Sequence, residues 1–96
     1  RRGNSLANRY LVMYMRKRDD EGENRVGISV SKKVGNSVVR NRVRRRMKEA
    51  YRTILPELSG NHSLVFVARA SITSAEFSDI CTQMRRLLER AGILSR

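Results

Sequence analysis

The hydrophobic residues near the start of the chain alternate with other residues at a period of two. The first alternating segment is RYLVMYMR, residues 9–16. One side of the alternation collects the residues that we expect to face a core: Leu11, Met13 and Met15. The other side collects the residues that we expect on the opposite face: Tyr10, Val12 and Tyr14. Period two with aromatic and β-branched side chains is typical of strands, so the segment is predicted to be one.

A second alternating segment follows a polar stretch. Residues 19–24 (DDEGEN) contain a glycine among charged and polar residues, which is typical of a turn. In residues 25–31 (RVGISVS) the apolar positions Val26, Ile28 and Val30 alternate with arginine, glycine and serine. Two strands joined in this way predict an antiparallel hairpin with a long loop. Small residues would then adjoin the tyrosines on the outward face: Gly27, Ser29 and Ser31.

The period lengthens to that of a helix after residue 36. Five apolar residues fall within an arc of about 80° when each residue turns the helix by 100°, and Tyr51 lies at its edge. They form the stripe that we expect to pack on the sheet: Val39, Val43, Met47, Ala50 and Ile54. Asn36 or Ser37 can cap the start of this helix, and Pro56 must end it.

The remaining chain predicts one more strand and one more helix. Residues 63–70 (SLVFVARA) are mostly apolar and predict a buried strand. Thr73 and Glu76 have the spacing of a capping box at the start of a helix that Gly92 would end. Its inward positions are apolar: Phe77, Ile80, Cys81, Met84, Leu87, Leu88 and Ala91.

The predicted order is therefore β-β-α-β-α. We expect an α+β fold, a two-layer α–β sandwich in which both helices cover one face of the sheet. The other face would stay open and carry the two tyrosines and the valine at positions 10, 12 and 14.

Length and charge narrow the class of partner. The chain has 96 residues, enough for a single domain, and 40% of them are hydrophobic. Lys and Arg total 21 against nine Asp and Glu, giving a formal net charge of +12. Residues 24–48 include nine basic residues and no acid. This imbalance favours a polyanionic partner such as a nucleic acid.

Other chemistry is sparse in the sequence. Cys81 is the only cysteine, so no internal disulfide can form and a reducing, cytoplasmic setting fits. There is no apolar run of membrane-spanning length and no apolar signal region. We expect His62 to be structural or solvated. The acids at 19, 20, 21 and 23 could hold a hydrated Mg²⁺, but a solvated turn is the simpler interpretation.

The side of the long helix opposite its apolar stripe is almost entirely basic. Like charges at i,i+4 repel by a few tenths of a kcal/mol per pair, and bound phosphates would relieve that repulsion. We interpret this side as a nucleic-acid-binding surface; the alternative is a solvated helix face. Arg40 would flank the stripe on one side, and Arg42 and Arg46 on the other. The outer arc holds Asn41, Arg44, Arg45, Lys48 and Arg52.

The open sheet face is a second candidate surface. Aromatic and β-branched side chains beside small residues can stack single-stranded bases. The alternative is that this face packs under an N-terminal segment. The chain starts at Arg1 without a methionine, and we expect a turn or helix end at Gly3–Asn4, so such a segment is predicted to be missing.

Three stretches together resemble the protein subunit of bacterial ribonuclease P. The most specific is GISVSKKVGNSVVRNRVRRRMKEAYR (27–52), in which a strand and a Ser-Lys-Lys turn lead into a helix that opens with Arg-Asn-Arg. SLANRYLVMY (5–14) resembles the family's first strand. VFVARASITSAEF (65–77) resembles its last strand and the turn into the final helix. The likeness covers almost the whole chain.

The resemblance implies a ribonucleoprotein that removes the 5′ leader from precursor tRNA. The catalytic RNA would bind the Mg²⁺ ions and hydrolyse the phosphodiester bond. The chain would be an endoribonuclease subunit with no catalytic and no metal-binding residue of its own, needing no protein partner. The implied fold is similar to the ribosomal protein S5 domain 2-like fold, with a left-handed β-α-β crossover. The implied location is the cytoplasm.

The resemblance also assigns residues to the two RNAs. The catalytic RNA would contact Arg40, Asn41, Arg42, Arg44, Arg45 and Lys48, with Lys32 and Lys33 nearby. The 5′ leader would contact Val12 and Tyr14, with Tyr10 beside them. Two departures stand out: the family's N-terminal helix is absent before Arg1, and Arg46 replaces a usually apolar residue, so we expect its side chain at the sheet edge. A structural RNA-binding protein of similar layout and a stand-alone nuclease remain as alternatives.

Overall fold

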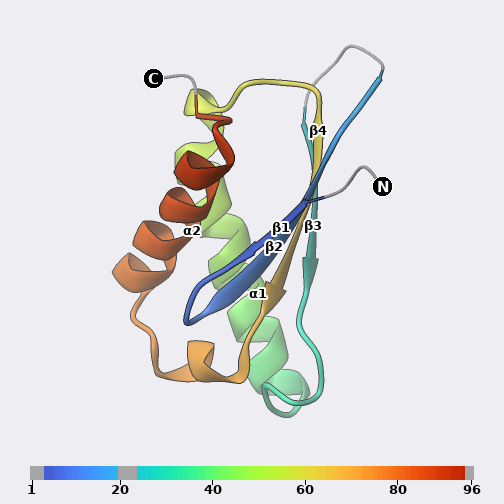
Figure 1. The fold of residues 1–96 in the computed structure, drawn as a ribbon. Coiled ribbons are helices and arrows are strands. Elements are labelled where there is room, and N and C mark those ends of the chain that lie inside the picture. The colour runs from blue at the N-terminus through green and yellow to red at the C-terminus, as the bar shows by residue number, and fades with distance from the viewer. Residues whose placement is uncertain (1–3, 20–23, 95–96) are drawn as a thin grey trace.

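The computed structural model describes residues 4–19 and 24–94. Four strands and two helices follow one another in the order β-β-β-α-β-α. Two short 3₁₀ turns lie at Leu55–Glu57 and Ala70–Ser74. Both helices cover one face of the sheet, so the expected two-layer α+β sandwich is confirmed (Figure 1). The elements are β1 (Asn4–Ala7), β2 (Leu11–Lys17), β3 (Arg25–Ser29), α1 (Ser37–Ile54), β4 (His62–Ala68) and α2 (Phe77–Ala91).

The first strand was not expected from the sequence. Asn4 lies in β1 rather than at a turn or helix end, and Gly3 lies outside the described residues. The segment NSLA holds a single large apolar residue, Leu6, so it carries no alternation that could reveal a strand. It becomes a strand by pairing antiparallel with β2, Leu6 opposite Met13.

The predicted hairpin between residues 9–16 and 25–31 is wrong. The sheet order is β1-β2-β4-β3, so β4 lies between the two strands that were expected to pair. β4 is antiparallel to β2 and parallel to β3. Its sequence HSLVFVA is apolar on both faces, which is typical of a central strand, and a central strand must be paired on both edges.

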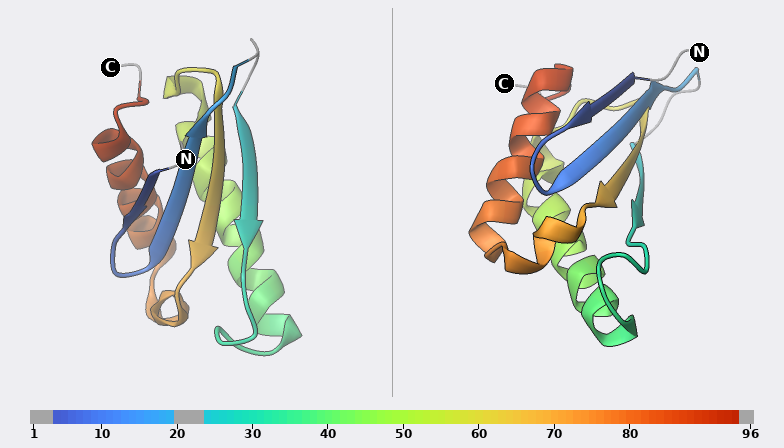
Figure 2. Two further views of the ribbon diagram at one scale, coloured as in Figure 1. Left: turned by 45° about the vertical axis from the view of Figure 1, so that its right-hand side comes forward. Right: turned by 60° about the horizontal axis from the view of Figure 1, so that its bottom comes forward.

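The parallel pair gives the sheet an uncommon connection. In the left view of Figure 2, β3 and β4 both run downward, β4 lies to the left of β3, and α1 lies behind the sheet. The β3–α1–β4 crossover is therefore left-handed, as the family resemblance implies. About 98% of such crossovers are right-handed, so a left-handed one is a specific mark of this fold.

The core lies between the sheet and the two helices. Its fully buried large side chains come from β2, α1, β4, the Ala70–Ser74 turn and α2: Leu11, Met13, Met47, Ile54, Leu64, Phe66, Ile72, Ile80, Met84, Leu87 and Leu88. The predicted inward faces are thus largely confirmed. Two positions differ: Val26 is 40% exposed on the edge strand β3, and Phe77 is 39% exposed at the first turn of α2.

The helix ends follow capping rules, with one correction. The side chain of Asn36 accepts a hydrogen bond from the Val39 N–H, and Gly92 ends α2 with a φ of 77°. The capping box at α2 pairs Glu76 with Asp79, not Thr73 with Glu76. Thr73 belongs instead to the 3₁₀ turn Ala70–Ser74, which closes before α2 begins.

Gly35 allows the turn before α1 to approach the helix closely. A Cβ at Gly35 would lie 2.9 Å from the Cβ of Val39, which is too close for a side chain that cannot swing aside. We therefore expect Gly35→Ala to lower the free energy of unfolding by about 1–3 kcal/mol, as overpacking does. Denaturant unfolding measures it. Gly27→Ala is the control, because its Cβ would meet Val65 at an ordinary 3.8 Å; equal losses in the two variants would contradict this explanation.

Candidate nucleic-acid interface

The register of the sheet assembles its open face row by row. Tyr14 of β2 lies opposite Ser5 of β1 and Val65 of β4, and Val65 lies opposite Gly27 of β3. Residues directly opposite each other share one face, so these four residues form one row across the sheet. The next row is Ala7, Val12, Val67 and Ser29. The expected apolar platform with small neighbours therefore exists, but Gly27 and Ser29 lie two strands away from β2, not beside it.

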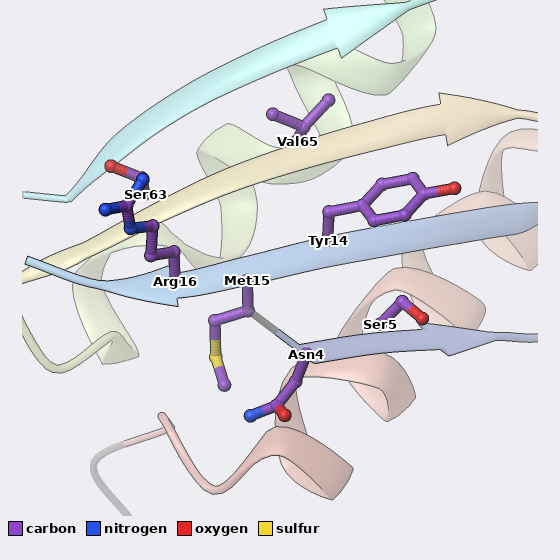
Figure 3. Close-up of a pocket in the computed structure, with 7 residues that line it drawn as sticks. All are labelled: Asn4, Ser5, Tyr14, Met15, Arg16, Ser63 and Val65. Carbon is purple, nitrogen blue, oxygen red and sulfur yellow. The ribbon is translucent and has the colours of Figure 1, made fainter. Parts of the chain in front are cut away.

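A shallow groove of about 480 Å³ lies on this face. Tyr14 is 51% exposed and Val65 40% exposed, so apolar surface is open to a ligand. Figure 3 shows the Tyr14 ring beside Val65, and the guanidinium of Arg16 above Ser63. Arg16 was not singled out from the sequence, although its place in the period-two pattern puts it on this face. The groove is lined by Asn4, Ser5, Tyr14, Met15, Arg16, Ser63 and Val65.

The expected exposure of Tyr10 on this face is wrong. Its side chain is only 9% exposed and belongs to the core cluster. The cause is Asn8, whose Oδ1 accepts the backbone N–H groups of Tyr10 and Leu11 at 3.2 and 3.0 Å. This turn places residue 10 before β2 begins, outside the alternation of the strand. The Cζ atom of Arg9 lies 5.3 Å from the centre of the Tyr10 ring.

Asn8 also ties the sheet to α2. Its Nδ2 donates to the Gln83 carbonyl at 3.0 Å, and its own carbonyl accepts from Arg69. Arg90 donates to the neighbouring Ala7 carbonyl at 3.1 Å. The turn between β1 and β2 is thus fixed from two sides. The sequence signal was an asparagine just before a strand, a common turn residue that does not reveal its distant partners.

The basic residues of α1 face solvent, as predicted. Asn41, Arg42, Arg45 and Lys48 are exposed, and so are Lys32 and Lys33 in the turn before the helix. Arg40 and Arg44 are half-buried. Arg40 donates to the Gly35 carbonyl at 3.2 Å, and Arg44 donates to Oδ1 of Asn41 at 3.0 Å. The second bond uses the amide oxygen of the exposed Asn41 and holds the two side chains together at the surface.

Little negative charge offsets this surface. Glu49 is the only acid of α1, and it pairs with Arg52 at 3.3 Å on an exposed part of the helix. Such exposed pairs are weak and screened by salt. The stronger pair is bidentate, between Arg85 of α2 and Glu57 at 2.8 and 2.6 Å, and lies outside the basic surface. The hydrogen bond to Glu57 raises the pKa of Arg85.

Arg46 does not lie at the sheet edge as expected. It is exposed, and its Nη1 is 3.5 Å from the Ala75 carbonyl, on the side of α1 that faces the Ala70–Ser74 turn and α2. A small cavity of about 160 Å³ there is lined by Val39, Arg42, Val43, Arg46, Ile72, Thr73 and Ile80.

The remaining polar candidates are dispersed. His62 opens β4 and is half-buried, and Cys81 is half-buried against the core. Asp19 is exposed, while Asp20, Glu21 and Glu23 lie outside the described residues. In residues 4–19 and 24–94, no three His, Cys, Asp or Glu side chains lie close enough to hold a metal ion. No helix in the same residues is long and apolar enough to cross a membrane.

Comparisons with known proteins agree on one family. The family model described as Ribonuclease P matches residues 1–92. A ribonuclease P protein component from Clostridium botulinum is 49% identical over 97% of this chain and 84% of the relative. One from Clostridioides difficile is 48% identical over 95% of this chain and 80% of the relative. The solved RNase P protein of Staphylococcus aureus superposes with a TM-score of 0.85 at 29% identity, covering 96% of this chain and 84% of that protein. That of Thermotoga maritima superposes with a TM-score of 0.83 at 27% identity, covering 92% of this chain and 83% of that protein.

Tyr51, at the edge of the α1 stripe, carries an unsatisfied hydroxyl. Its Oη is buried and has no hydrogen-bond partner in the described residues, and burial raises the pKa of Tyr51. We expect Tyr51→Phe to raise the free energy of unfolding by about 0.5–1 kcal/mol, because it removes a buried polar group without a partner. Denaturant unfolding at neutral pH measures this; a loss of stability would show that the hydroxyl is satisfied.

The ionisation of the Tyr51 hydroxyl predicts how the stability of the fold changes at alkaline pH. The unfolded chain ionises Tyr51 near a pKa of about 10, and the folded chain does so only at higher pH. This ionisation therefore leaves stability unchanged below about pH 10, and stability falls as pH rises above it, because the unfolded chain then releases the proton more readily than the folded chain. Melting temperature against pH should fall less steeply for Tyr51→Phe than for the parent in this range. Parallel curves would contradict the raised pKa.

Proposed function

Since the chain belongs to the ribonuclease P protein family, we propose that its two exposed surfaces bind two different RNAs. The chain is the protein subunit of ribonuclease P, an endoribonuclease, and assists the RNA subunit in the 5′ maturation of tRNA. Membership implies association with the ribonuclease P RNA. The finer assignment of surfaces rests on the separation of the basic helix from the open sheet face by the whole thickness of the sandwich.

The basic surface of α1 binds the catalytic RNA. Its contacts are Arg40, Asn41, Arg42, Arg44, Arg45 and Lys48, supplemented by Lys32 and Lys33 in the preceding turn. Arginine matches phosphate with two parallel hydrogen bonds, and counterions released from the RNA favour binding. The bond from Arg44 to Asn41 supports this, because it holds a guanidinium and an amide together at the exposed surface.

The open sheet face binds the 5′ leader of precursor tRNA. Val12 and Tyr14 supply the apolar surface, and Val65 and Val67 of β4 continue it. Leader nucleotides are single-stranded, and their bases can stack on an aromatic ring whatever their sequence. Arg16 at the edge of the groove adds a cation for a phosphate. Tyr10 has no part in this surface because its ring is buried.

The chain contributes binding rather than bond cleavage. We assign no residue of it a catalytic role: the RNA subunit holds the Mg²⁺ ions and carries out the hydrolysis. The protein holds leader and catalytic RNA at once, so the leader binds within an assembly instead of from solution, which raises its effective concentration. It acts as a single RNA-binding domain, in the cytoplasm where precursor tRNA is made, without a further protein partner.

The role of α1 predicts a change in the salt dependence of assembly. Arg40→Ala combined with Arg42→Ala should weaken binding to the catalytic RNA more than it destabilises the fold. The slope of log affinity against log salt should become shallower by about 0.7–0.9 for each phosphate that the variant no longer neutralises. Lys17→Ala combined with Arg86→Ala removes equal charge from exposed residues outside α1 and is the control. An unchanged slope and affinity in the α1 variant, or equal effects in both, would exclude this role.

The role of the open face predicts discrimination between two tRNAs. Tyr14→Ala should cost the holoenzyme about 1–3 kcal/mol of affinity for precursor tRNA, because a leader base loses its stacking partner. Affinity for mature tRNA, which has no leader, should not change. Phe77→Ala removes another exposed aromatic ring, on α2, and should affect neither.

Both affinities are measured with variants whose melting temperatures match the parent. If Tyr14→Ala weakens binding of precursor and mature tRNA equally, the ring acts through assembly, and the leader assignment fails.

A further inference from the structure

A second apolar groove lies between the edge strand β3 and α1. It has a volume of about 450 Å³. Among the described residues the large exposed apolar side chains are Tyr14, Val26, Val38, Leu55, Val65 and Phe77. Tyr14 and Val65 line the open-face groove, whereas Val26 and Leu55 line this one. It is lined by Val26, Ile28, Arg44, Lys48, Tyr51, Arg52 and Leu55.

The floor of this groove is apolar and continuous with the core. Val26 and Ile28 lie opposite Leu64 and Phe66 of β4, which are fully buried beneath the helices. The Tyr51 ring packs against Phe66 with its centroid 6.0 Å away. A ligand here would therefore rest on rigid, well-packed side chains, although Val26 is 40% and Leu55 47% exposed without it.

The rim of this groove is cationic. Arg44, Lys48 and Arg52 are spaced by four residues, so they form a line along one side of α1. Only Arg52 has an acidic partner in the described residues, the exposed Glu49. On the other side runs β3, which pairs with β4 alone and presents the backbone N–H and C=O groups of its outer edge.

We propose that this groove holds an unpaired nucleotide of the catalytic RNA. Its base would rest on Val26, Tyr51 and Leu55, and its phosphates would meet Arg44 and Lys48. Apolar floor, cationic rim and hydrogen-bonding strand edge match the three parts of a nucleotide that proteins recognise when a base is unstacked.

The rim selects RNA over an acidic peptide. This inference rests on the proposed function of α1, because Arg44 and Lys48 are the residues that already meet the phosphates of the catalytic RNA there. Phosphates are thus at the mouth of the groove in the assembled enzyme, and a base attached to them needs no further charge from the protein. The contacts of the cations with phosphates weaken as the salt concentration rises. The contact of the base with the apolar floor of the groove involves no charge and should not depend on salt.

The test removes the floor and keeps every cation. Val26→Ser combined with Leu55→Ser should weaken binding of the full chain to the catalytic RNA roughly tenfold, which corresponds to about 1.4 kcal/mol. The slope of log affinity against log salt should not change, because every cation is retained. Val38→Ser is the control, since Val38 lies on α1 outside this groove and is 73% exposed. It should leave both quantities unchanged.

Chemical probing identifies the nucleotide. In the complex with the parent protein, at least one unpaired base of the catalytic RNA should be protected from a base-specific reagent. That base should react again with the double variant, while backbone protections along α1 persist. If the double variant does not fold, Val26→Thr keeps the branched shape, adds a hydroxyl to the floor and should show the same effect in weaker form.

The inference would be overturned if the folded variants bound the catalytic RNA with unchanged affinity and left the reactivity of its bases unchanged. It would also be overturned if an acidic test peptide of alternating Glu and Leu bound in the groove without weakening the binding of the catalytic RNA. The Arg40→Ala and Arg42→Ala variant separates the two claims. If the Arg40→Ala and Arg42→Ala variant weakens assembly and the groove variants do not, only the groove assignment fails. If the Arg40→Ala and Arg42→Ala variant has no effect on assembly, the proposed role of α1 fails, and the groove assignment that rests on it fails too.

Discussion

The central strand β4 is the element on which the rest of the structure depends. One face of it buries Leu64 and Phe66 under the helices, and the other presents Val65 and Val67. Its two edges hold β2 antiparallel and β3 parallel. The parallel pairing forces the chain to cross over through α1, which places the basic helix on the side opposite the open face. The two surfaces that we propose to bind RNA thus both follow from the pairing of one strand.

The strands and α1 contain almost no negatively charged residues. Within the described residues the four strands carry no acid, and α1 carries one. A helix that stacks cations on adjacent turns is weakened by their repulsion and must be stabilised by packing. Here Val43, Met47, Ala50 and Ile54 supply that packing. The core therefore maintains a basic surface that the helix alone would disfavour, and in the proposed complex the phosphates of the RNA would relieve the repulsion.

The sequence was sufficient for what depends on local periodicity. The α1 stripe, its Asn36 cap, the stop at Gly92 and the inward face of β2 all follow from spacing along one element. Pairing could not be predicted in this way. The polar sequence at 19–24 suggested a hairpin between the flanking strands, whereas each of these strands pairs with β4 instead. β1 has too few apolar residues to be recognised. The burial of Tyr10 depends on a turn closed by Asn8, which interrupts the alternation. The groove beside Val26 could not be predicted, because the sequence does not reveal that β3 is an edge strand with one neighbour.

The separation of two RNAs by the sandwich is tested most directly by mapping which RNA lies near each face. Cys81→Ser removes the natural thiol, and Ser5→Cys or Arg45→Cys then carries a tethered hydroxyl-radical source on the open face or on α1. In the holoenzyme with precursor tRNA, the reagent at position 5 should cut the 5′ leader, and the reagent at position 45 should cut the catalytic RNA. Cutting of the leader from position 45, or of the catalytic RNA alone from both positions, would contradict the account.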